Sequence, residues 1–459
     1  MIDFENFQEA EAHDYYELIR MLYPKFVSEE KLKLINKGSS VVFVGGGRTL
    51  SLNLEKGLDK EQRRRRIKTF ILKDLNYPGK IPSAFGILTG VRPVKLVLEL
   101  LETMSLSDLK DYLKKNYSIE DKMIDFLLSI GQKERAYFST VDPFGYSVYL
   151  HIPFCPSRCA YCSYPMIKSS NRESLDSYVE TLLLELDTYK DLKVPPTSIY
   201  IGGGTPTSIG EKYLRRILSK VQKIFHSQCE FTVEAGRPDT LNDSIFSALK
   251  DYGVNRISIN PQTMHDKTLK ILNRQHSVTD FLQAYNLGKK YDFNINVDLI
   301  LGLPQENRQD ILDSLNQVIA LDPDNITIHT LSLKNGSQLF QQGEYFNTSF
   351  IVSEVIQEVY TILKSLDYAP YYMYRQKRTL GNGFNAGYSK PKKESIYNML
   401  MMDEGQSILG FGMSSSTKFY DPKTNRIEKI LQYKNLKDYL NHWNDKNAKK
   451  SQLREDFKW

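Results

Sequence analysis

The chain has few cysteines and no long apolar run. Only four cysteines occur in 459 residues, and three of them fall between Cys155 and Cys162. A disulfide framework would spread an even number of cysteines through a short secreted chain, so this clustering favours metal binding in a reducing compartment. No run reaches the roughly eighteen apolar residues of a membrane span, and the opening MIDFENFQEAEAHDYYE is acidic where a signal peptide would be basic. We therefore expect a cytoplasmic protein without a membrane span.

The sequence also lacks a strong excess of either charge. Its 61 Lys and Arg residues against 55 Asp and Glu residues give a formal net charge of +6. This balance gives no reason to expect nucleic acid as a partner, and it leaves acidic small molecules as candidates. With 41% hydrophobic residues, the chain can bury a large core divided among two or three domains.

From about residue 147 onward, apolar β-rich runs alternate with amphipathic segments such as SLDSYVETLLLELDTYK. There are six such runs, at residues 147–152, 198–203, 230–235, 256–262, 294–301 and 325–331. Alternation of this kind is typical of βα units around a parallel sheet. The sequence predicts an α/β fold, a partial TIM-like (β/α)6 barrel over residues 145–334. Residues 1–144 are expected to form an α/β accessory domain of unknown role, and residues 335–459 a C-terminal α+β extension that covers the substrate.

Polar and glycine residues follow the predicted strands at the same end. Cys155 follows the first strand, Gly204 the second, and Glu234 and Gln262 end the third and fourth. Because functional groups of such folds collect at the carboxyl ends of the strands, we expect these side chains to share one site.

The cysteines Cys155, Cys159 and Cys162 form a C-x3-C-x2-C motif on the loop after the first predicted strand. Three thiolates on a short loop can hold three irons of a [4Fe-4S] cluster, and the fourth iron is then free to chelate a small molecule. A structural zinc site is the alternative, with Cys229 and His226 in HSQCEF as possible further ligands. Three unrelated buried cysteines are the other alternative. Cys229 alone is interpreted as a small buried residue.

Several segments together carry a resemblance to a known family. The run YLHIPFCPSRCAYC is followed by YIGGGTPT, FTVEAGRP, RISINPQT, LNRQ, VDLILGLP and ILGFGMSSS. This set, over about residues 145–420, resembles the oxygen-independent coproporphyrinogen III oxidases, which are radical S-adenosylmethionine (SAM) enzymes. GILTGVRP, YYMYRQK and ESIYNMLMM are similar to the Gram-positive branch often named coproporphyrinogen dehydrogenase.

The resemblance implies a [4Fe-4S] cluster on the three cysteines and a bound S-adenosylmethionine. The cofactor-binding residues that it implies are Tyr149, Gly203, Gly204, Thr205, Glu234, Gln262, Arg274 and Asp298. Gly202 to Gly204 would let the backbone approach the methionine amino group. Gln262 and Asp298 would bind ribose hydroxyls, and Arg274 would pair with the methionine carboxylate.

The implied reaction is radical removal of two propionate carboxyl groups from coproporphyrinogen III, giving the vinyl groups of protoporphyrinogen IX. No catalytic residue beyond the cofactor's radical is implied. Cations in the C-terminal region are expected to bind the carboxylates of this tetrapyrrole substrate: Arg375, Lys377, Arg378 and Lys390. An unidentified reductant similar to flavodoxin or ferredoxin would supply the electron, and we expect a monomer.

Two features limit what the resemblance implies about substrate. The best-known oxidases of the family carry a further cysteine two residues after the third ligand, where this chain has Tyr164. Related members look like haem-trafficking proteins that keep the cluster loop without oxidase activity, although their HNxxYW motif is not seen here. A haem-binding protein and a radical SAM enzyme with another substrate therefore stay open as alternatives.

Overall fold

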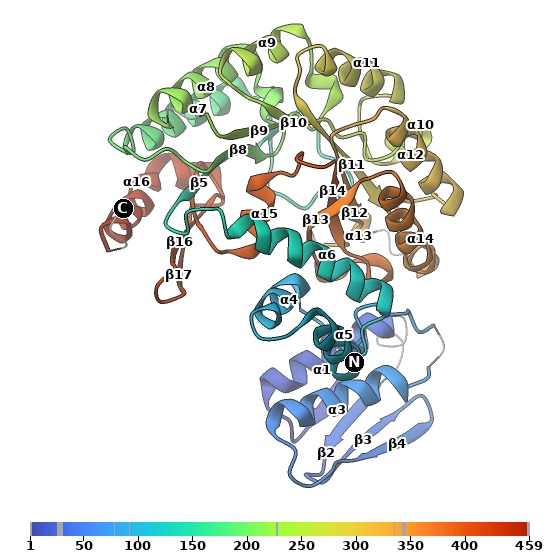
Figure 1. Ribbon diagram of the computed structural model, residues 1–459. Coiled ribbons are helices and arrows are strands. Elements are labelled where there is room, and N and C mark those ends of the chain that lie inside the picture. The colour runs from blue at the N-terminus through green and yellow to red at the C-terminus, as the bar shows by residue number, and fades with distance from the viewer. Residues whose placement is uncertain are drawn as a thin grey trace. The chain divides into compact units, whose positions relative to one another are not determined.

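The computed structural model describes residues 2–24, 31–77, 79–90, 92–225, 228–334, 336–341 and 346–456. The chain forms two compact units (Figure 1). The first consists of Met1–Lys133, Glu344–Glu358 and Met373–Asn385, and the second of Glu134–Gly343, Val359–Tyr372 and Ala386–Trp459. Among the described helices, none combines the length and the apolar character that a membrane crossing requires.

The first unit contains a four-stranded sheet with helices. Its strands are β1 (Ile2–Glu5), β2 (Leu32–Asn36), β3 (Ser40–Gly45) and β4 (Arg48–Asn53), in that order. β1 is parallel to β2, and the other pairs are antiparallel. The helices are α1 (Glu9–Leu22), α3 (Lys60–Lys73), α4 (Pro93–Leu101), α5 (Leu106–Tyr117) and α6 (Asp121–Phe138), the last of which continues into the second unit. Alternate residues of β3, such as Val41 and Phe43, are buried in one core with residues of α1 and α3.

An arginine run, residues 63–66, lies on α3 and makes specific contacts within this unit. Arg64 Nε donates to Asp14 Oδ2 at 2.7 Å, and Arg65 lies 5.0 Å from the centre of the Tyr117 ring. Two of these side chains therefore tie α3 to neighbouring helices.

The second unit is built on six parallel strands that follow one another in chain order, as predicted. They are β5 (Tyr146–Ile152), β8 (Ser198–Gly203), β9 (Glu230–Glu234), β10 (Arg256–Ser258), β11 (Asn294–Leu301) and β12 (Asn325–Thr330). The helices α7 (Arg172–Asp187), α8 (Glu211–Phe225), α9 (Asp243–Asp251), α11 (Val278–Lys289) and α12 (Arg308–Ala320) alternate with them and line the outside of the arc (Figure 1). Shorter elements of the same unit are β6 (Phe154–Cys155), β7 (Ile167–Lys168), η1 (Pro206–Ile209), η2 (Pro238–Thr240), α10 (Asp266–Ile271) and α13 (Gln338–Gln341). This is the predicted α/β partial barrel.

The later part of the chain continues the same sheet at both edges. β15 (Ser407–Phe411) lies parallel beside β5, and β16 (Ser416–Asp421) and β17 (Arg426–Leu431) extend that edge in antiparallel fashion. At the other edge, β14 (Asn385–Ser389) runs antiparallel to β12, and β13 (Ala369–Tyr374) follows. The remaining elements of this part are α14 (Phe346–Ser365), η3 (Leu380–Asn382), α15 (Ile396–Asp403) and α16 (Leu436–Asp456). The boundaries at residues 144 and 334, as functional divisions, stay predictions.

Helix α15 is held at its amino end by a buried carboxylate. Glu230, the first residue of β9, accepts hydrogen bonds at 3.0 Å from the backbone N–H groups of Ile396 and Tyr397 and from the Ser395 hydroxyl. Arg256 Nε donates to the same carboxylate at 3.1 Å. A carboxylate is favourable at a helix amino terminus because the free N–H groups and the helix dipole both attract negative charge. This anchor fixes α15 against the strands.

Helix α16 is joined to the barrel by a buried ion pair. Lys450 Nζ lies 2.8 Å from Glu185 Oε1, and these side chains are 1% and 0% exposed. Glu185 also accepts hydrogen bonds from the Gln432 amide at 3.0 Å, the Tyr439 hydroxyl at 2.9 Å and the Gly412 N–H at 2.8 Å. The carboxylate is thus fully hydrogen-bonded, as a buried charge must be.

Candidate functional site

One cavity of about 650 Å³ opens at the carboxyl ends of the parallel strands. All eleven residues predicted for the cluster and the cofactor line it: Tyr149, Cys155, Cys159, Cys162, Gly203, Gly204, Thr205, Glu234, Gln262, Arg274 and Asp298. The fold therefore brings together residues that are far apart in the chain, as expected for groups at the carboxyl ends of parallel strands. Residues of α15, β15, β16 and β17 complete the walls.

The cysteine loop is closed by main-chain hydrogen bonds. Strand β6 pairs with β7, and the N–H of Ile167 donates to the Pro153 carbonyl at 2.8 Å. Within the loop, the N–H of Cys162 donates to the Cys159 carbonyl at 3.0 Å. The N–H of Ala160 donates to the Leu272 carbonyl at 2.9 Å, which ties the loop to the segment before Arg274. The backbone that carries the three thiols is therefore fixed by the fold.

A glycine is required where β8 meets this loop. The N–H of Gly204 donates to the Ile152 carbonyl at 2.8 Å. A Cβ atom on Gly204 would lie 2.6 Å from the Phe154 carbonyl oxygen and 3.0 Å from Cys155 Sγ. Only glycine allows the two chain segments to approach this closely, so Gly204 fixes the end of β8 against the loop that carries the thiols.

The thiols are set in surroundings that disfavour a free thiolate. Burial raises the pKa of Cys155 to about 11, although a hydrogen bond with Thr205 acts in the opposite direction. Burial likewise raises the pKa of Cys162. Cys155 and Cys162 therefore need cationic partners, such as iron, to be stable as the thiolates that bind metal. The donor set and the glycine-lined space together fit an iron-sulfur cluster.

Of the two further ligands considered for a zinc site, the structure describes only Cys229. Cys229 directly precedes β9, at the opposite end of that strand from Glu234, and is absent from the described residues that line the cavity. His226 lies outside the described residues. Within the described ranges, no group of three or more His, Cys, Asp and Glu side chains is arranged to hold a single metal ion.

Three tyrosine rings stack beside Glu234. The rings of Tyr200 and Tyr397 lie 4.5 Å apart at 23°, and the Tyr149 ring lies 6.2 Å from each. The Tyr200 hydroxyl donates to Glu234 Oε1 at 2.5 Å, and the N–H of Gly203 donates to Glu234 Oε2 at 3.2 Å. Burial raises the pKa of Glu234, and the nearby Asp298 acts in the same direction. The stack gives the cavity a flat, largely apolar wall.

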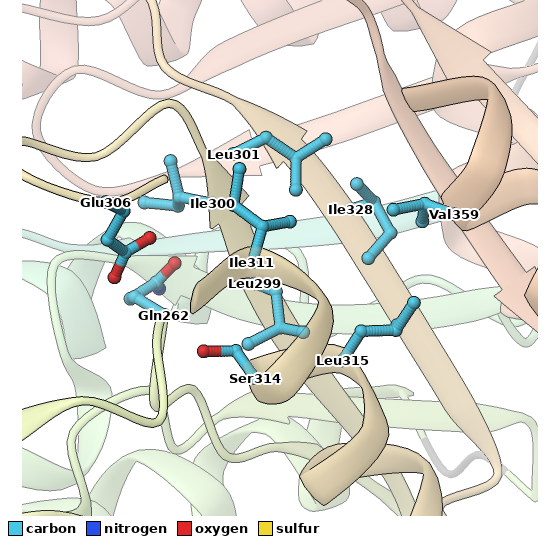
Figure 2. Close-up of a pocket in the computed structure, with 10 residues that line it drawn as sticks. All are labelled: Gln262, Leu299, Ile300, Leu301, Glu306, Ile311, Ser314, Leu315, Ile328 and Val359. Carbon is cyan, nitrogen blue, oxygen red and sulfur yellow. The ribbon is translucent and has the colours of Figure 1, made fainter. Parts of the chain in front are cut away.

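Gln262 and Asp298 lie next to each other across the parallel strands. Gln262 has a φ of 71°, and its N–H donates to the Asp298 carbonyl at 3.1 Å. Its side-chain oxygen Oε1 is buried and has no hydrogen-bond partner among the described residues. An unpaired buried amide oxygen is costly unless a ligand or water satisfies it, so it suits a ligand hydroxyl. Gln262 also borders a second cavity of about 10 Å³, which has room for about one water molecule. Figure 2 shows Glu306 and Ser314 among the other residues that line it.

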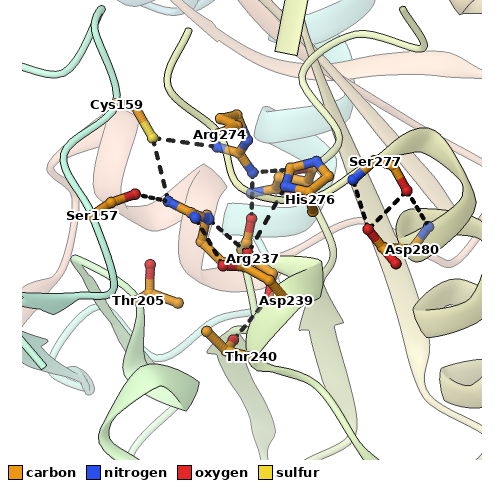
Figure 3. A network of polar contacts seen from close by, with 12 residues as sticks. Ser157, Cys159, Thr205, Arg237, Asp239, Thr240, Arg274, His276, Ser277 and Asp280 are labelled. Carbon is orange, nitrogen blue, oxygen red and sulfur yellow. Dashed lines mark hydrogen bonds and ion pairs between the residues drawn. The ribbon is translucent and has the colours of Figure 1, made fainter. Parts of the chain in front are cut away.

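Two buried arginines approach Cys159 (Figure 3). Arg274 Nη1 lies 3.9 Å from Cys159 Sγ and donates to the Tyr161 hydroxyl at 2.9 Å, while Nη2 donates to the carbonyls of Gly236 and Asn260. Arg237 Nη1 lies 3.7 Å from the same sulfur. Arg237 was not predicted as a site residue, although it lies in the quoted segment FTVEAGRP.

His276 is buried beside this arginine pair, and neither ring nitrogen has a hydrogen-bond partner among the described residues. Burial, and after it the positive charge of Arg274, lower the pKa of His276 to about 3. The folded protein therefore takes up this proton at much lower pH than the unfolded chain does. Because the unfolded state binds more protons between about pH 3 and pH 6.5, the free energy of unfolding falls as the pH is lowered through this range.

We expect the His276→Asn variant to lose less stability on acidification than the wild-type protein. One unit of pKa shift corresponds to about 1.4 kcal/mol, so the two proteins should differ by about 2 kcal/mol in their change between about pH 7 and about pH 5. Urea unfolding of the metal-free proteins at the two pH values measures this difference. Equal pH dependence would show that His276 is protonated in the folded state as readily as in the unfolded state.

The four cations predicted to bind substrate carboxylates are absent from the described residues that line the cavity. Arg375 is buried in the first unit, where Nη1 donates to the Leu88 carbonyl at 2.6 Å. Lys377 and Arg378 belong to the same unit, and Lys377 lies 3.9 Å from Glu17. Lys390, in the second unit, pairs with Asp322 at 2.6 Å. Their role in substrate binding stays a prediction.

Comparison with known proteins identifies the family to which the chain belongs. The model of the radical SAM superfamily matches residues 149–318. The oxygen-independent coproporphyrinogen-III oxidase-like protein HemZ of Bacillus subtilis (strain 168) is 36% identical over 388 residues, which cover 80% of this chain and 77% of that protein. The chain belongs to this radical SAM family. Membership implies a [4Fe-4S] cluster and S-adenosylmethionine as cofactors, and the family resemblance seen in the sequence is confirmed.

Two further relatives of this radical SAM protein differ in what they are named for. The heme chaperone HemW of Buchnera aphidicola subsp. Acyrthosiphon pisum (strain APS) is 28% identical over 300 residues, covering 64% of this chain and 75% of that protein. The solved structure of coproporphyrinogen III oxidase (HemN) from Escherichia coli matches with a TM-score of 0.53 at 18% identity, covering 68% of this chain and 73% of that chain. This last likeness supports the fold alone, and it agrees with the predicted partial barrel.

Proposed function

We propose that this protein catalyses the anaerobic oxidative decarboxylation of coproporphyrinogen III to protoporphyrinogen IX. Its [4Fe-4S] cluster would be held by Cys155, Cys159 and Cys162, and S-adenosylmethionine would bind beside it. The observation that supports this most is that all eleven predicted cluster and cofactor residues line one cavity. When bound, the cluster and S-adenosylmethionine would supply one-electron radical chemistry that side chains cannot provide.

The protein's own residues would bind and orient the cofactor. Gly204 lets the end of β8 pack directly against the cysteine loop, since a Cβ atom there would lie 2.6 Å from the Phe154 carbonyl oxygen. Gln262 presents a buried oxygen without a partner, which suits a ribose hydroxyl. Arg274, held by neutral acceptors, keeps a positive charge at the cavity for the methionine carboxylate. These interactions would fix the cofactor at the cluster.

The substrate would lie on the tyrosine side of the cavity. Stacked rings of Tyr149, Tyr200 and Tyr397 offer a flat apolar surface to a macrocycle. Lys418 on β16 and Lys429 on β17 also line the cavity, where Lys429 pairs with Glu404 at 2.7 Å. Substrate contacts of Arg375, Lys377, Arg378 and Lys390 remain part of the proposal, as do a flavodoxin- or ferredoxin-like reductant, a monomeric state and a cytoplasmic location.

The deciding experiment is an anaerobic turnover assay with reconstituted, chemically reduced protein, S-adenosylmethionine and coproporphyrinogen III. We expect release of carbon dioxide and formation of a vinyl-bearing porphyrin product. Cleavage of S-adenosylmethionine without decarboxylation would point to another substrate. Absence of both reactions in protein that carries a full cluster would contradict the proposal.

A haem carrier is the second candidate, and it is favoured by the 28% identity to a heme chaperone over 64% of this chain. Tyr164, which stands where the best-known oxidases have a further cysteine, is 56% exposed and lines the same cavity. A carrier would leave coproporphyrinogen III unchanged in the turnover assay, and it would bind haem tightly when haem is added separately. Haem titration of the same preparation therefore separates the two functions.

Replacing Asp298 by alanine should weaken S-adenosylmethionine binding much more than cluster assembly. Asp298 lies on β11, where it accepts a hydrogen bond from Asn296 at 2.6 Å, and it is not a thiol ligand. Loss of a hydrogen bond between a charged group and a ribose hydroxyl costs about 1.5–3 kcal/mol, which is roughly a tenfold to hundredfold weaker affinity. Isothermal titration measures the affinity, and iron analysis measures the cluster.

The control for this experiment is Asp313→Ala, which removes a carboxylate on α12 that accepts from Gln309 at 2.8 Å. This variant should keep both the affinity for S-adenosylmethionine and the iron content. An equal loss of iron and of cofactor affinity in Asp298→Ala would mean that Asp298 supports the fold of the site rather than the cofactor.

A further inference from the structure

Arg237 is buried at the cysteine loop and points its guanidinium at one thiol. It is 3% exposed, and its Nη1 donates toward Cys159 Sγ at 3.7 Å and to the Ser157 hydroxyl at 3.3 Å (Figure 3). Cys159 is itself 9% exposed. A guanidinium at this depth has little water around it, so its interaction with the sulfur is weakly screened.

Asp239 fixes the direction of this guanidinium. Arg237 Nε donates to Asp239 Oδ1 and Nη2 to Oδ2, both at 2.8 Å, so the carboxylate takes one side of the fork and leaves Nη1 facing the sulfur. The short helix η2, which starts at Pro238, holds Asp239 two residues after Arg237. The arginine is therefore charged and preorganised.

The other charged groups around Cys159 have different partners. Arg274 is farther from the sulfur, at 3.9 Å, and its guanidinium is occupied by the Tyr161 hydroxyl and two carbonyl groups. Its cavity-facing position is the one proposed for the methionine carboxylate. His276 lies 3.9 Å from Asp239 on the side away from the sulfur, as Figure 3 shows. Arg237 thus differs from Arg274 and His276, because its carboxylate partner Asp239 directs an N–H group at the Cys159 sulfur.

We propose that Arg237 is a positioning residue that hydrogen-bonds the Cys159 thiolate and raises the reduction potential of the cluster. This inference rests on the proposed cluster ligation by Cys155, Cys159 and Cys162. Hydrogen bonds to the sulfurs and nearby charge are among the factors that set the potentials of iron-sulfur clusters. A cation and an N–H donor at a ligand sulfur stabilise the reduced state, which carries one more negative charge. Arg237 would therefore make it easier for a biological reductant to deliver the electron.

The test is the midpoint potential of the reconstituted cluster, followed by electron paramagnetic resonance during an anaerobic redox titration. Arg237→Gln removes the charge and should shift the one-electron reduction equilibrium about tenfold toward the oxidised form, which is a shift of about 59 mV to more negative potential. The double variant Arg237→Gln with Asp239→Asn removes the pair without changing net charge. It should lie between Arg237→Gln and the wild-type protein, because only the directed N–H group is lost.

A matched control is Arg216→Gln on α8, where an arginine pairs with Glu180 at 2.7 Å on the surface. It removes the same charge far from the thiols and should leave the potential unchanged. Circular dichroism and thermal unfolding establish that each variant is folded before its potential is measured.

The outcomes separate this inference from the proposed function. Wild-type protein that takes up no iron and sulfide would refute the cluster ligation itself. A fully loaded Arg237→Gln protein with the wild-type potential would overturn the role of Arg237 and leave the proposed function standing. Folded Arg237→Gln and double variants that both fail to assemble a cluster would also overturn it, because Arg237 would then serve assembly rather than the potential.

Discussion

Replacing Cys159 by serine should abolish the iron-sulfur cluster while leaving the fold largely unchanged. If the three cysteines hold the cluster, a serine hydroxyl at Cys159 supplies a much poorer ligand for iron than a thiolate. Iron in reconstituted protein should then fall from about four atoms per chain to below about one, and the visible absorbance should vanish. Iron analysis and the absorbance spectrum measure the loss.

The fold should survive this change because the loop is held by its backbone. The main-chain hydrogen bonds of Cys159 and Ala160, to Cys162 and Leu272, do not involve the thiol. The helix signal in circular dichroism should therefore stay near the wild-type value. The matched control is Cys229→Ser, which changes a thiol absent from the described lining of the cavity and should keep its iron. Retention of iron and sulfide by Cys159→Ser would refute the assignment of this ligand.

Replacing Lys450 by methionine should strongly destabilise the second unit. Methionine is close to lysine in size but leaves Glu185 as an uncompensated charge at 0% exposure. Breaking a buried pair by removing one partner costs about 3–5 kcal/mol, because the remaining charge is desolvated without its counterion. Urea unfolding followed by circular dichroism should show this loss as a lower midpoint.

Two variants of α16 and α7 test the cause of this loss. Lys449→Met changes the neighbouring, exposed lysine and should alter the free energy of unfolding by less than about 0.5 kcal/mol. Lys450→Met combined with Glu185→Gln removes both charges and should recover part of the stability. If Lys450→Met alone unfolds at the wild-type urea concentration, the ion pair contributes nothing to the stability of the unit.

The strands of the barrel could be predicted closely because each carries a local pattern. The predicted runs at 198–203 and 294–301 coincide with β8 and β11. The run at 256–262 was predicted too long, since β10 ends at Ser258. Pro261 has no N–H group to donate to a neighbouring strand, and Gln262 turns to a positive φ and keeps only an isolated bridge to Leu299. A proline inside an apolar run was the signal that could have corrected the boundary.

The site residues that stand at the end of a predicted strand could be found from the sequence. Those that reach the site through long-range contacts could not. Cys155, Gly204 and Glu234 follow strands, so one rule places them together. Tyr397 reaches the tyrosine stack only because Glu230 anchors α15, a contact between distant segments that no local pattern encodes. Arg237 gave a weak signal, because its contact with Cys159 joins two segments that are far apart in the sequence.

The pairing of β15 with β5 has a consequence for the order of events during synthesis. Tyr146, in the first strand of the barrel, is paired with Ser407, which is synthesised much later. Long-range parallel pairing of this kind forms slowly, and a growing chain has no partner for that edge of β5 until β15 has been made. The walls that β15, β16 and β17 contribute are then also missing. Iron delivered before β15, β16 and β17 are synthesised would therefore meet an incomplete cavity, and we expect the metal centre to be assembled after these strands have paired.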